Sequence, residues 1–276
     1  MLRKIAFLCI VWPVLAAENT ALVEALKGTV TINKTNPVSA FEWLPDGAVL
    51  KTGLKSSATV ILLNGHRFEL GPSARAIIGA THLSATAGPI RELDPVPPIP
   101  KIAPLSIATG TAAGTAFRGA GKIRGLCPRE GMVALAGPVT LSFQKVDGAA
   151  AYQVIVQDAE GNSIADEHTR STEITIPLQP SRHYSWRIRA LGAAGVIAEN
   201  QAGFVTLSTE QIQARKAFAD GIRTLPNGLA LLAEVDLASG LVREAIDGFQ
   251  AALKLKPNDP ALSRGLHRAE LALAGK

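Results

Sequence analysis

Short runs in which apolar and polar side chains alternate constrain the first third of this chain more than any other feature. Residues 29–32 alternate in this way. The apolar run Val60–Leu63 ends at Asn64 and Gly65. Successive side chains of a strand point to opposite faces, and Asn-Gly favours a tight hairpin because both residues tolerate positive φ. Residues 26–72 are therefore predicted to form a twisted all-β fold of short strands.

The same segment contains four pieces in a fixed order, namely Leu26 to Ile32, Leu44 to Gly53, Ser56 to Leu62, and Asn64 to Pro72. In this order they resemble the periplasmic domain of the FecR (iron-dicitrate regulator) family. The resemblance implies an envelope signalling or assembly module rather than an enzyme. FecR regulators carry a cytoplasmic anti-sigma segment and a transmembrane helix before this domain, and here a different leader stands in their place. Direct control of a sigma factor is therefore not implied.

The first 17 residues have the layout of a secretory signal peptide. Arg3 and Lys4 precede an apolar run, residues 5–15, and Ala16 and Ala17 offer a small-residue cleavage site. The run is too short to span a bilayer. We therefore expect a cleaved signal peptide (residues 1–17) and a periplasmic protein of a Gram-negative bacterium, with no integral membrane span. The alternative is an uncleaved anchor on a FecR-type transmembrane signal regulator.

Charge and cysteine content narrow the function further. The net charge is +5, but Arg3 and Lys4 leave with the signal peptide, so the remaining chain is only mildly basic. Such a weak, dispersed charge argues against nucleic acid as a partner. Export also leaves Cys127 as a single thiol, which we expect to be a small buried side chain rather than half of an intramolecular disulfide.

A proline-rich segment separates the first β-domain (residues 18–93) from the second. Residues 94–104 contain five prolines, which fix φ and remove backbone donors, so a semi-rigid polyproline II spacer is predicted. Residues 109–125 are rich in Gly, Ala and Thr. They are interpreted as a plain linker or an added strand, with a basic contact arm as the alternative. The whole linker is placed at residues 94–123.

Residues 124–207 are predicted to form a second all-β domain. Four alternating runs, separated by turn residues, suggest a sandwich; they are Val139–Phe143, Tyr152–Val156, Glu173–Ile176 and Tyr184–Ala190. The pattern resembles a fibronectin type III-like module, with Phe143 at the position of its usual Trp.

The last of these runs has two predicted faces. Trp186 and its apolar neighbours should point inward, and Arg187 and Arg189 should point outward. The two arginines are candidates for contact with an acidic partner, or simply part of a solvated face.

From Ser208 onward the apolar period becomes helical, and residues 208–276 are predicted to be helices. Seven positions resemble one tetratricopeptide repeat: Leu229, Leu232, Ala233, Ala245, Phe249, Ala252 and Pro257. Asp236 occupies a position where that family usually has an aromatic residue. Asp259 and Pro260 are predicted to cap and begin a final helix. Because one repeat cannot bury its own faces, this segment should dock on the second domain, pair with another copy, or receive a partner's segment.

No pattern in the sequence indicates catalysis. The five histidines are scattered, and the acidic cluster next to His168 is interpreted as a solvated loop. We therefore expect no enzyme activity, no cofactor and no metal. The residues singled out as speculative partner contacts are Trp43, Arg187, Arg189 and Asp236. Trp43 is the one tryptophan expected to be exposed, and it would serve a cell-wall glycan-binding module, a further alternative.

The sequence as a whole predicts a multidomain chain: two all-β domains, a FecR-like β-fold and a fibronectin type III-like sandwich, followed by a tetratricopeptide-like helical hairpin. The predicted function is non-enzymatic scaffolding in the periplasm. The expected partners are cell-envelope proteins, such as an outer-membrane receptor or a peptidoglycan-associated protein. Self-association through the helical end is a further possibility.

Overall fold

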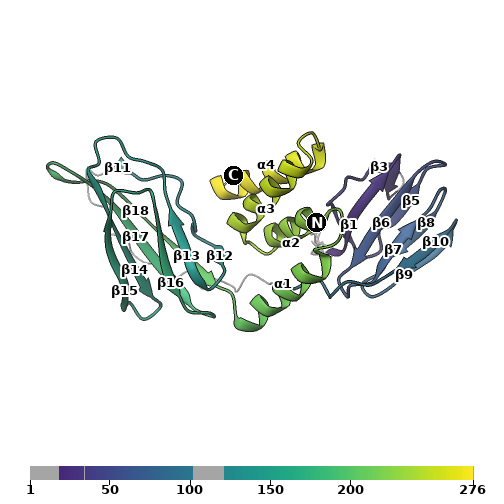
Figure 1. The fold of residues 1–276 in the computed structure, drawn as a ribbon, viewed down its shortest axis with the longest axis horizontal. Coiled ribbons are helices and arrows are strands. Elements are labelled where there is room, and N and C mark those ends of the chain that lie inside the picture. Colours follow the sequence, from purple (N-terminus) through teal and green to yellow (C-terminus); the bar gives the residue numbers. More distant parts are fainter. Residues whose placement is uncertain (1–18, 34, 102–120, 276) are drawn as a thin grey trace, which may run out of the picture.

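The computed structural model describes residues 19–33, 35–101 and 121–275. The chain is mostly β-sheet with four helices among these residues. It has three regions: an N-terminal β-region (residues 19–101), a second β-region (121–207) and a helical region (208–275). In Figure 1 the helical region lies between the two β-regions. The predicted signal peptide, residues 1–17, and residues 102–120 of the predicted linker lie outside the described part of the chain.

The N-terminal β-region consists of two five-stranded sheets. The first has the order β10-β7-β6-β1-β4 and the second β3-β2-β5-β8-β9. The strands are β1 (Asn19–Lys27), β2 (Val30–Ile32), β3 (Asn36–Pro37), β4 (Trp43–Pro45), β5 (Val49–Thr52), β6 (Ser57–Leu62), β7 (Arg67–Leu70), β8 (Arg75–Ile78), β9 (Leu83–Ala87) and β10 (Ile90–Leu93). The predicted hairpin is confirmed, because β6 and β7 pair in antiparallel fashion and Gly65 has a φ of 89°.

The central strands β1 and β6 of the first sheet are buried on both faces. Val60 and Leu62 of β6 belong to the apolar core between the two sheets. Ile61, which points the other way, packs with Leu22 of β1 against the helices. A strand covered on both faces needs a continuous apolar run rather than alternation, which explains the sequence around Val60.

The described part of the proline-rich segment packs against the rest of the chain. Val96 and Ile99 are buried in the same apolar cluster as the helices. Their backbone N–H groups donate to the carbonyl oxygens of Gly65 and Leu63, at 3.0 and 2.9 Å. The segment has no helix or strand over residues 94–101, and its apolar residues between the prolines bury against the helices and the N-terminal β-region.

The second β-region is built around one apolar core. Its larger sheet has the order β11-β18-β17-β14-β15, with β12 also pairing with β18, and β13 pairs with β16. The strands are β11 (Gly121–Lys122), β12 (Met132–Ala134), β13 (Gly137–Ser142), β14 (Ala151–Asp158), β15 (Ser163–Thr169), β16 (Glu173–Leu178), β17 (His183–Gly192) and β18 (Gly195–Thr206). Trp186 is buried as predicted, and its Nε1 donates to the Pro128 carbonyl oxygen at 2.8 Å.

The helical region contains α1 (Thr209–Ile222), α2 (Gly228–Ala238), α3 (Val242–Leu255) and α4 (Pro260–Ala274). Asp259 caps α4 as predicted, since its Oδ1 accepts from the backbone N–H of Ala261 at 2.8 Å. Phe249 of α3 is fully buried among the helices. The helical character of residues 208–275 and the start of the last helix at Pro260 are thus confirmed.

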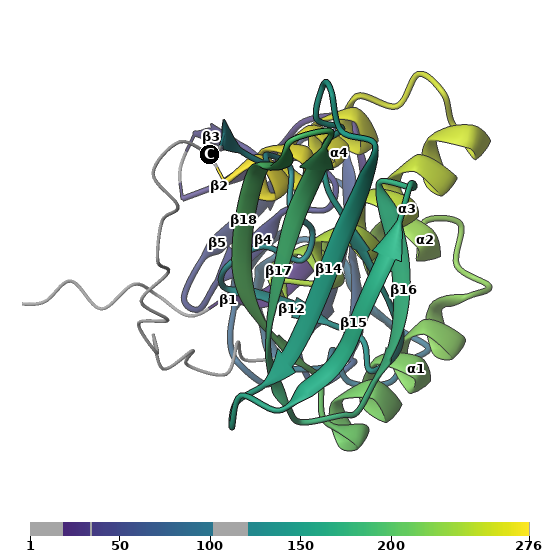
Figure 2. The ribbon, with the colours of Figure 1, turned by 90° about the vertical axis from the view of Figure 1, so that its left-hand side faces the viewer.

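The helices dock on both β-regions. Docking on the second β-region is one of the three alternatives that the sequence left open, whereas docking on the N-terminal β-region was not among them. On one side they share a core with β1, β6 and the proline-rich segment, and Asn227 Nδ2 donates to the Glu24 carbonyl oxygen at 3.0 Å. On the other side Leu241 packs with Val133 and Val205. Arg129 donates to the Ala272 carbonyl oxygen near the end of α4, at 2.7 and 3.0 Å, where a cation is favourable. Figure 2 shows the sheets of the second β-region in front of the helices. Among the described helices, none has the length and apolar character needed to cross a membrane.

Candidate functional site

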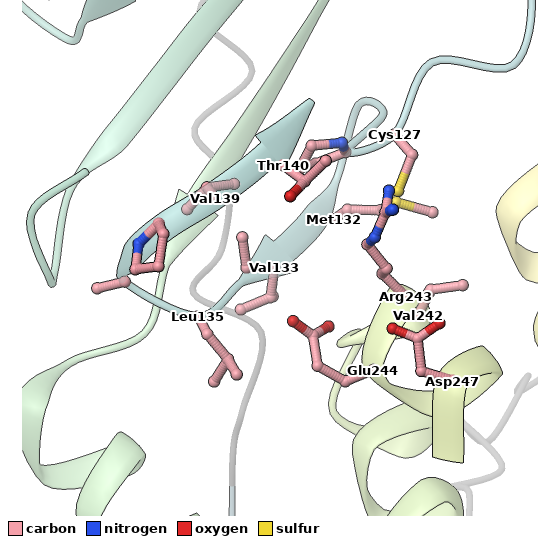
Figure 3. Close-up of a pocket in the computed structure, with 14 residues that line it drawn as sticks. Cys127, Met132, Val133, Leu135, Val139, Thr140, Val242, Arg243, Glu244 and Asp247 are labelled. Carbon is pink, nitrogen blue, oxygen red and sulfur yellow. The ribbon is translucent and has the colours of Figure 1, made fainter. Parts of the chain in front are cut away.

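A cleft of 280 Å³ lies where the second β-region meets the start of α3. One wall comes from β12, β13 and the residues that join them, and the other comes from the first turns of α3 (Figure 3). The polar and sulfur-containing side chains that characterise it are Cys127, Met132, Thr140, Arg243, Glu244 and Asp247. We refer to this feature as the α3 cleft.

The β-side of the α3 cleft is a strand edge. The backbone of Ser142 exchanges two hydrogen bonds of 2.8 Å with Cys127, whereas Phe143 N–H donates to Thr172 in the direction of β16. Because backbone groups alternate in direction along a strand, the N–H of Thr140 and the carbonyls of Pro138 and Thr140 point away from β16. Beyond Cys127 the chain leaves this edge and pairs with β18 as β12. Within the described residues, no strand pairs with this part of β13, which we call the free edge of β13.

The helical side of the α3 cleft is acidic. Glu244 and Asp247 are three residues apart on α3, so they share a helix face, and Figure 3 shows both carboxylates on the cleft side. Among the residues that the structure describes, neither carboxylate has a salt bridge. Burial raises the pKa of Glu244, and the nearby Asp236 and Asp247 carboxylates raise it further. The same shift shows that the ionised form of Glu244 is unfavourable here, and a cation from outside would stabilise that ionised form.

Arg243 and Cys127 close one end of the α3 cleft. The Arg243 guanidinium donates to Ser142 Oγ at 3.2 Å and to Glu173 at 3.1 Å, so it is already engaged. Cys127 is buried as predicted. Burial raises the pKa of its thiol, although Arg243 acts in the opposite direction. A thiol that remains protonated near neutral pH is a poor nucleophile, so this end of the cleft is a structural boundary.

Two of the four residues singled out from the sequence are placed differently from what was expected. Asp236 is 1% exposed, and its carboxylate accepts two hydrogen bonds of 2.6 Å from Arg215. Trp43 is half-buried against the helices, and its indole nitrogen, which is fully buried, faces the Glu234 carboxylate. Asp236 is thus paired within the chain, and Trp43 packs one side of its ring against the helices. The surfaces that cover Trp43 and Asp236 are formed by residues distant in sequence. The local sequence pattern therefore could not indicate that these two side chains would be covered.

Arg187 and Arg189 lie on the outward face of β17, as the alternation predicted. Arg187 donates to Gln201 at 3.5 Å, and Arg189 lies 3.6 Å from Glu199. Both partners are on the neighbouring strand β18. The structure therefore places these arginines in cross-strand pairs and apart from the α3 cleft.

The sequence offered little signal for the α3 cleft. Glu244 and Asp247 look like ordinary solvated residues on the polar face of a helix, and the free edge of β13 results from the path of the chain after Cys127. Pro128, which has no N–H and a fixed φ, is the one local hint that pairing would stop there. Within the described residues, no group of three or more His, Cys, Asp or Glu is arranged to hold a metal ion.

Replacing Glu244 with glutamine should stabilise the protein at neutral pH. The pKa of Glu244 in the folded protein is raised above its ordinary value of 4.5. The protonated side chain therefore contributes to stability at pH values below 4.5, and this contribution is lost as the pH rises through the folded-state pKa. At pH 7 the charged carboxylate therefore costs stability, and E244Q should gain roughly 0.5–2 kcal/mol. Urea unfolding at pH 7 and pH 4 measures this, with Glu270→Gln on the exposed face of α4 as the control. An equal gain at both pH values would contradict the assignment.

Comparison with known proteins does not assign this chain to a family. No family model and no curated protein matches it. Among solved structures, the twitchin kinase region from C. elegans is 21% identical over 33% of this chain, with a TM-score of 0.27, and the match spans 17% of that protein. CopC from Methylosinus trichosporium OB3b is 17% identical over 32% of this chain and 94% of its own, with a TM-score of 0.26. A β-1,2-glucanase from Parabacteroides distasonis is 9% identical over 86% of this chain and 49% of its own, with a TM-score of 0.24. These likenesses are too distant to indicate a function.

Proposed function

We propose that this protein is a non-enzymatic interaction or scaffold protein of the cell envelope, exported to the periplasm and cleaved after Ala17. The FecR resemblance of residues 26–72 makes an outer-membrane receptor or a peptidoglycan-associated protein the expected partner. The α3 cleft is the surface at which such a partner would bind.

The observation that carries the proposal is the docking of the helices on both β-regions. A scaffold must hold its binding surfaces in a fixed relation, and here apolar contacts on both sides of the helical region do so. The buried pair Arg215–Asp236 ties α1 to α2 within that region. The α3 cleft lies at one of these two junctions, so its walls are held by three elements at once: β12, β13 and α3.

The same packing weakens the alternative of a glycan-binding module. That alternative needed an exposed aromatic side chain, and Trp43 is half-buried against the helices. The alternative of a transmembrane regulator concerns the leader, which lies outside the described residues. Determining the N-terminal residue of the protein in the envelope distinguishes this alternative from export with cleavage. A chain that begins at Glu18 has lost its leader and therefore has no anchor there.

Site-specific photo-crosslinking in the native envelope tests the proposal. We expect a crosslinking residue at Leu135, which lines the α3 cleft, to attach an identified envelope protein. The same residue at Ile164, which is 44% exposed on β15, should not attach that protein. Equal labelling from both positions, or attachment of cytoplasmic proteins only, would contradict a specific envelope partner at this cleft.

A further inference from the structure

The α3 cleft combines an unpaired strand edge with an acidic wall, and the two together define what fits there. The chain pairs with β13 as far as Cys127 and then crosses to β18. A strand that continued along β13 would lie opposite Thr140 and Pro138, which is where the cleft is. Backbone N–H and C=O groups at such an edge are a ready template for one more strand.

The size of the edge suits a short extended segment. From Pro138 to Thr140 it presents three residues, which corresponds to about 10 Å of strand at roughly 3.3 Å per residue. Thr140 offers both a donor and an acceptor there, while Pro138 offers an acceptor alone because it has no N–H. Hydrogen bonds to these groups would fix the register of an incoming strand.

The acidic wall formed by α3 determines which side chains of an incoming strand would be stabilised in the cleft. Glu244 and Asp247 lack a salt-bridge partner among the described residues, and the nearest cation, Arg243, is engaged by Ser142 and Glu173. The remaining basic neighbour of Glu244, Arg215, is bound to Asp236. Arg243 acts on Asp247, and Arg215 acts on Glu244, only through the field of a guanidinium that is hydrogen-bonded to another residue, so neither carboxylate has a direct cationic partner. A lysine or arginine on the incoming strand would supply that partner in a partly dry environment, where an ion pair is stronger than in water.

We propose that the α3 cleft binds an extended, basic segment of a partner polypeptide, which adds as a strand to the free edge of β13 and places a Lys or Arg against Glu244 and Asp247. This inference rests on the proposed function and specifies its partner class. The apolar residues Val133, Leu135 and Val139 line the same cleft and suit β-branched side chains next to the basic residue.

Selection from a random heptapeptide display library on the mature chain tests this inference. We expect enriched peptides to carry a Lys or Arg next to β-branched residues and to lack proline at the centre. Fluorescence anisotropy with the best enriched peptide should then show about tenfold or greater weakening by the double variant E244Q/D247N.

A second pair of variants tests strand addition itself. Thr140→Pro removes the N–H at the free edge and should abolish binding. Thr140→Val keeps the backbone N–H, removes only the hydroxyl, and should bind within about twofold of the parent. Pro138, two residues away on the same edge, shows that this side of β13 accommodates proline.

Three outcomes would overturn the inference: no enrichment over the library, enrichment of acidic peptides, or full binding by Thr140→Pro. If crosslinking from Leu135 nevertheless attaches an envelope protein, the proposed function stands and the partner presents a folded surface rather than a strand. If neither experiment gives a specific signal, the proposed function fails with it.

Discussion

Replacing Arg215 with methionine should lower the free energy of unfolding by about 3–5 kcal/mol at pH 7, because it leaves a buried carboxylate without its partner. Asp236 is 1% exposed and accepts two hydrogen bonds of 2.6 Å from this guanidinium. Burial raises the pKa of Asp236, and Arg215 is what opposes that shift. Urea unfolding at pH 7 measures the loss.

The pH dependence of this loss has a definite sign. Without Arg215 the pKa of Asp236 rises further, so its carboxyl becomes neutral at a higher pH and the penalty of burying a charge disappears. The difference between R215M and the parent should therefore shrink as the pH falls from 7 to 5. A loss that stays constant over this range would mean that Arg215 acts through packing of its alkyl chain instead.

Two controls separate burial from pairing. Arg91 and Glu69 form a salt bridge of the same 2.6 Å length, but their side chains are 73% and 37% exposed. Arg91→Met should therefore cost under about 1 kcal/mol. The double variant R215M/D236L replaces the buried pair with apolar groups and should recover most of the stability lost in R215M. A double variant as unstable as R215M would contradict this explanation.

The pairing of Asp236 with Arg215 could not be predicted from the sequence. The departure of Asp236 from the tetratricopeptide pattern was visible in the sequence and was interpreted as a possible partner contact. The structure shows that its partner is within the chain, 21 residues earlier on α1. Sequence spacing located both helices, but it could not match an arginine on one to an aspartate on the other, because that pairing depends on how the helices pack.

The same distinction applies to the β-regions. The hairpin at Asn64-Gly65 and the inward face of Trp186 follow from local turn chemistry and from the period of two, and both are confirmed. The continuous apolar run at Val60 was also visible, but nothing local indicates that Ile61 meets helices more than 150 residues later. The α3 cleft was missed for the same reason, since its two walls belong to segments about 100 residues apart.

Replacing Phe249 with alanine should lower the free energy of unfolding by about 3–5 kcal/mol, because a fully buried aromatic ring leaves a cavity that its neighbours fill only in part. Phe249 is 0% exposed. It belongs to the apolar cluster in which all four helices pack together with β1 and β6 of the N-terminal β-region. Urea unfolding measures the change. Leu255→Ala, on the same helix but 73% exposed, is the matched control and should alter stability by under about 0.5 kcal/mol.

Substitutions at Gly265 test directly whether the Phe249 ring fills the space between α3 and α4. A Cβ added at Gly265 would lie 2.4 Å from the ring carbon Cε1 of Phe249, so Gly265→Ala alone should cost about 1–3 kcal/mol by overpacking. Combined with Phe249→Leu, the added methyl group occupies space that the ring no longer fills. The double variant should then lose less stability than the sum of the two single changes. Strict additivity would show that the two residues do not share this space. The helical region would then depend on other contacts to hold the two β-regions together.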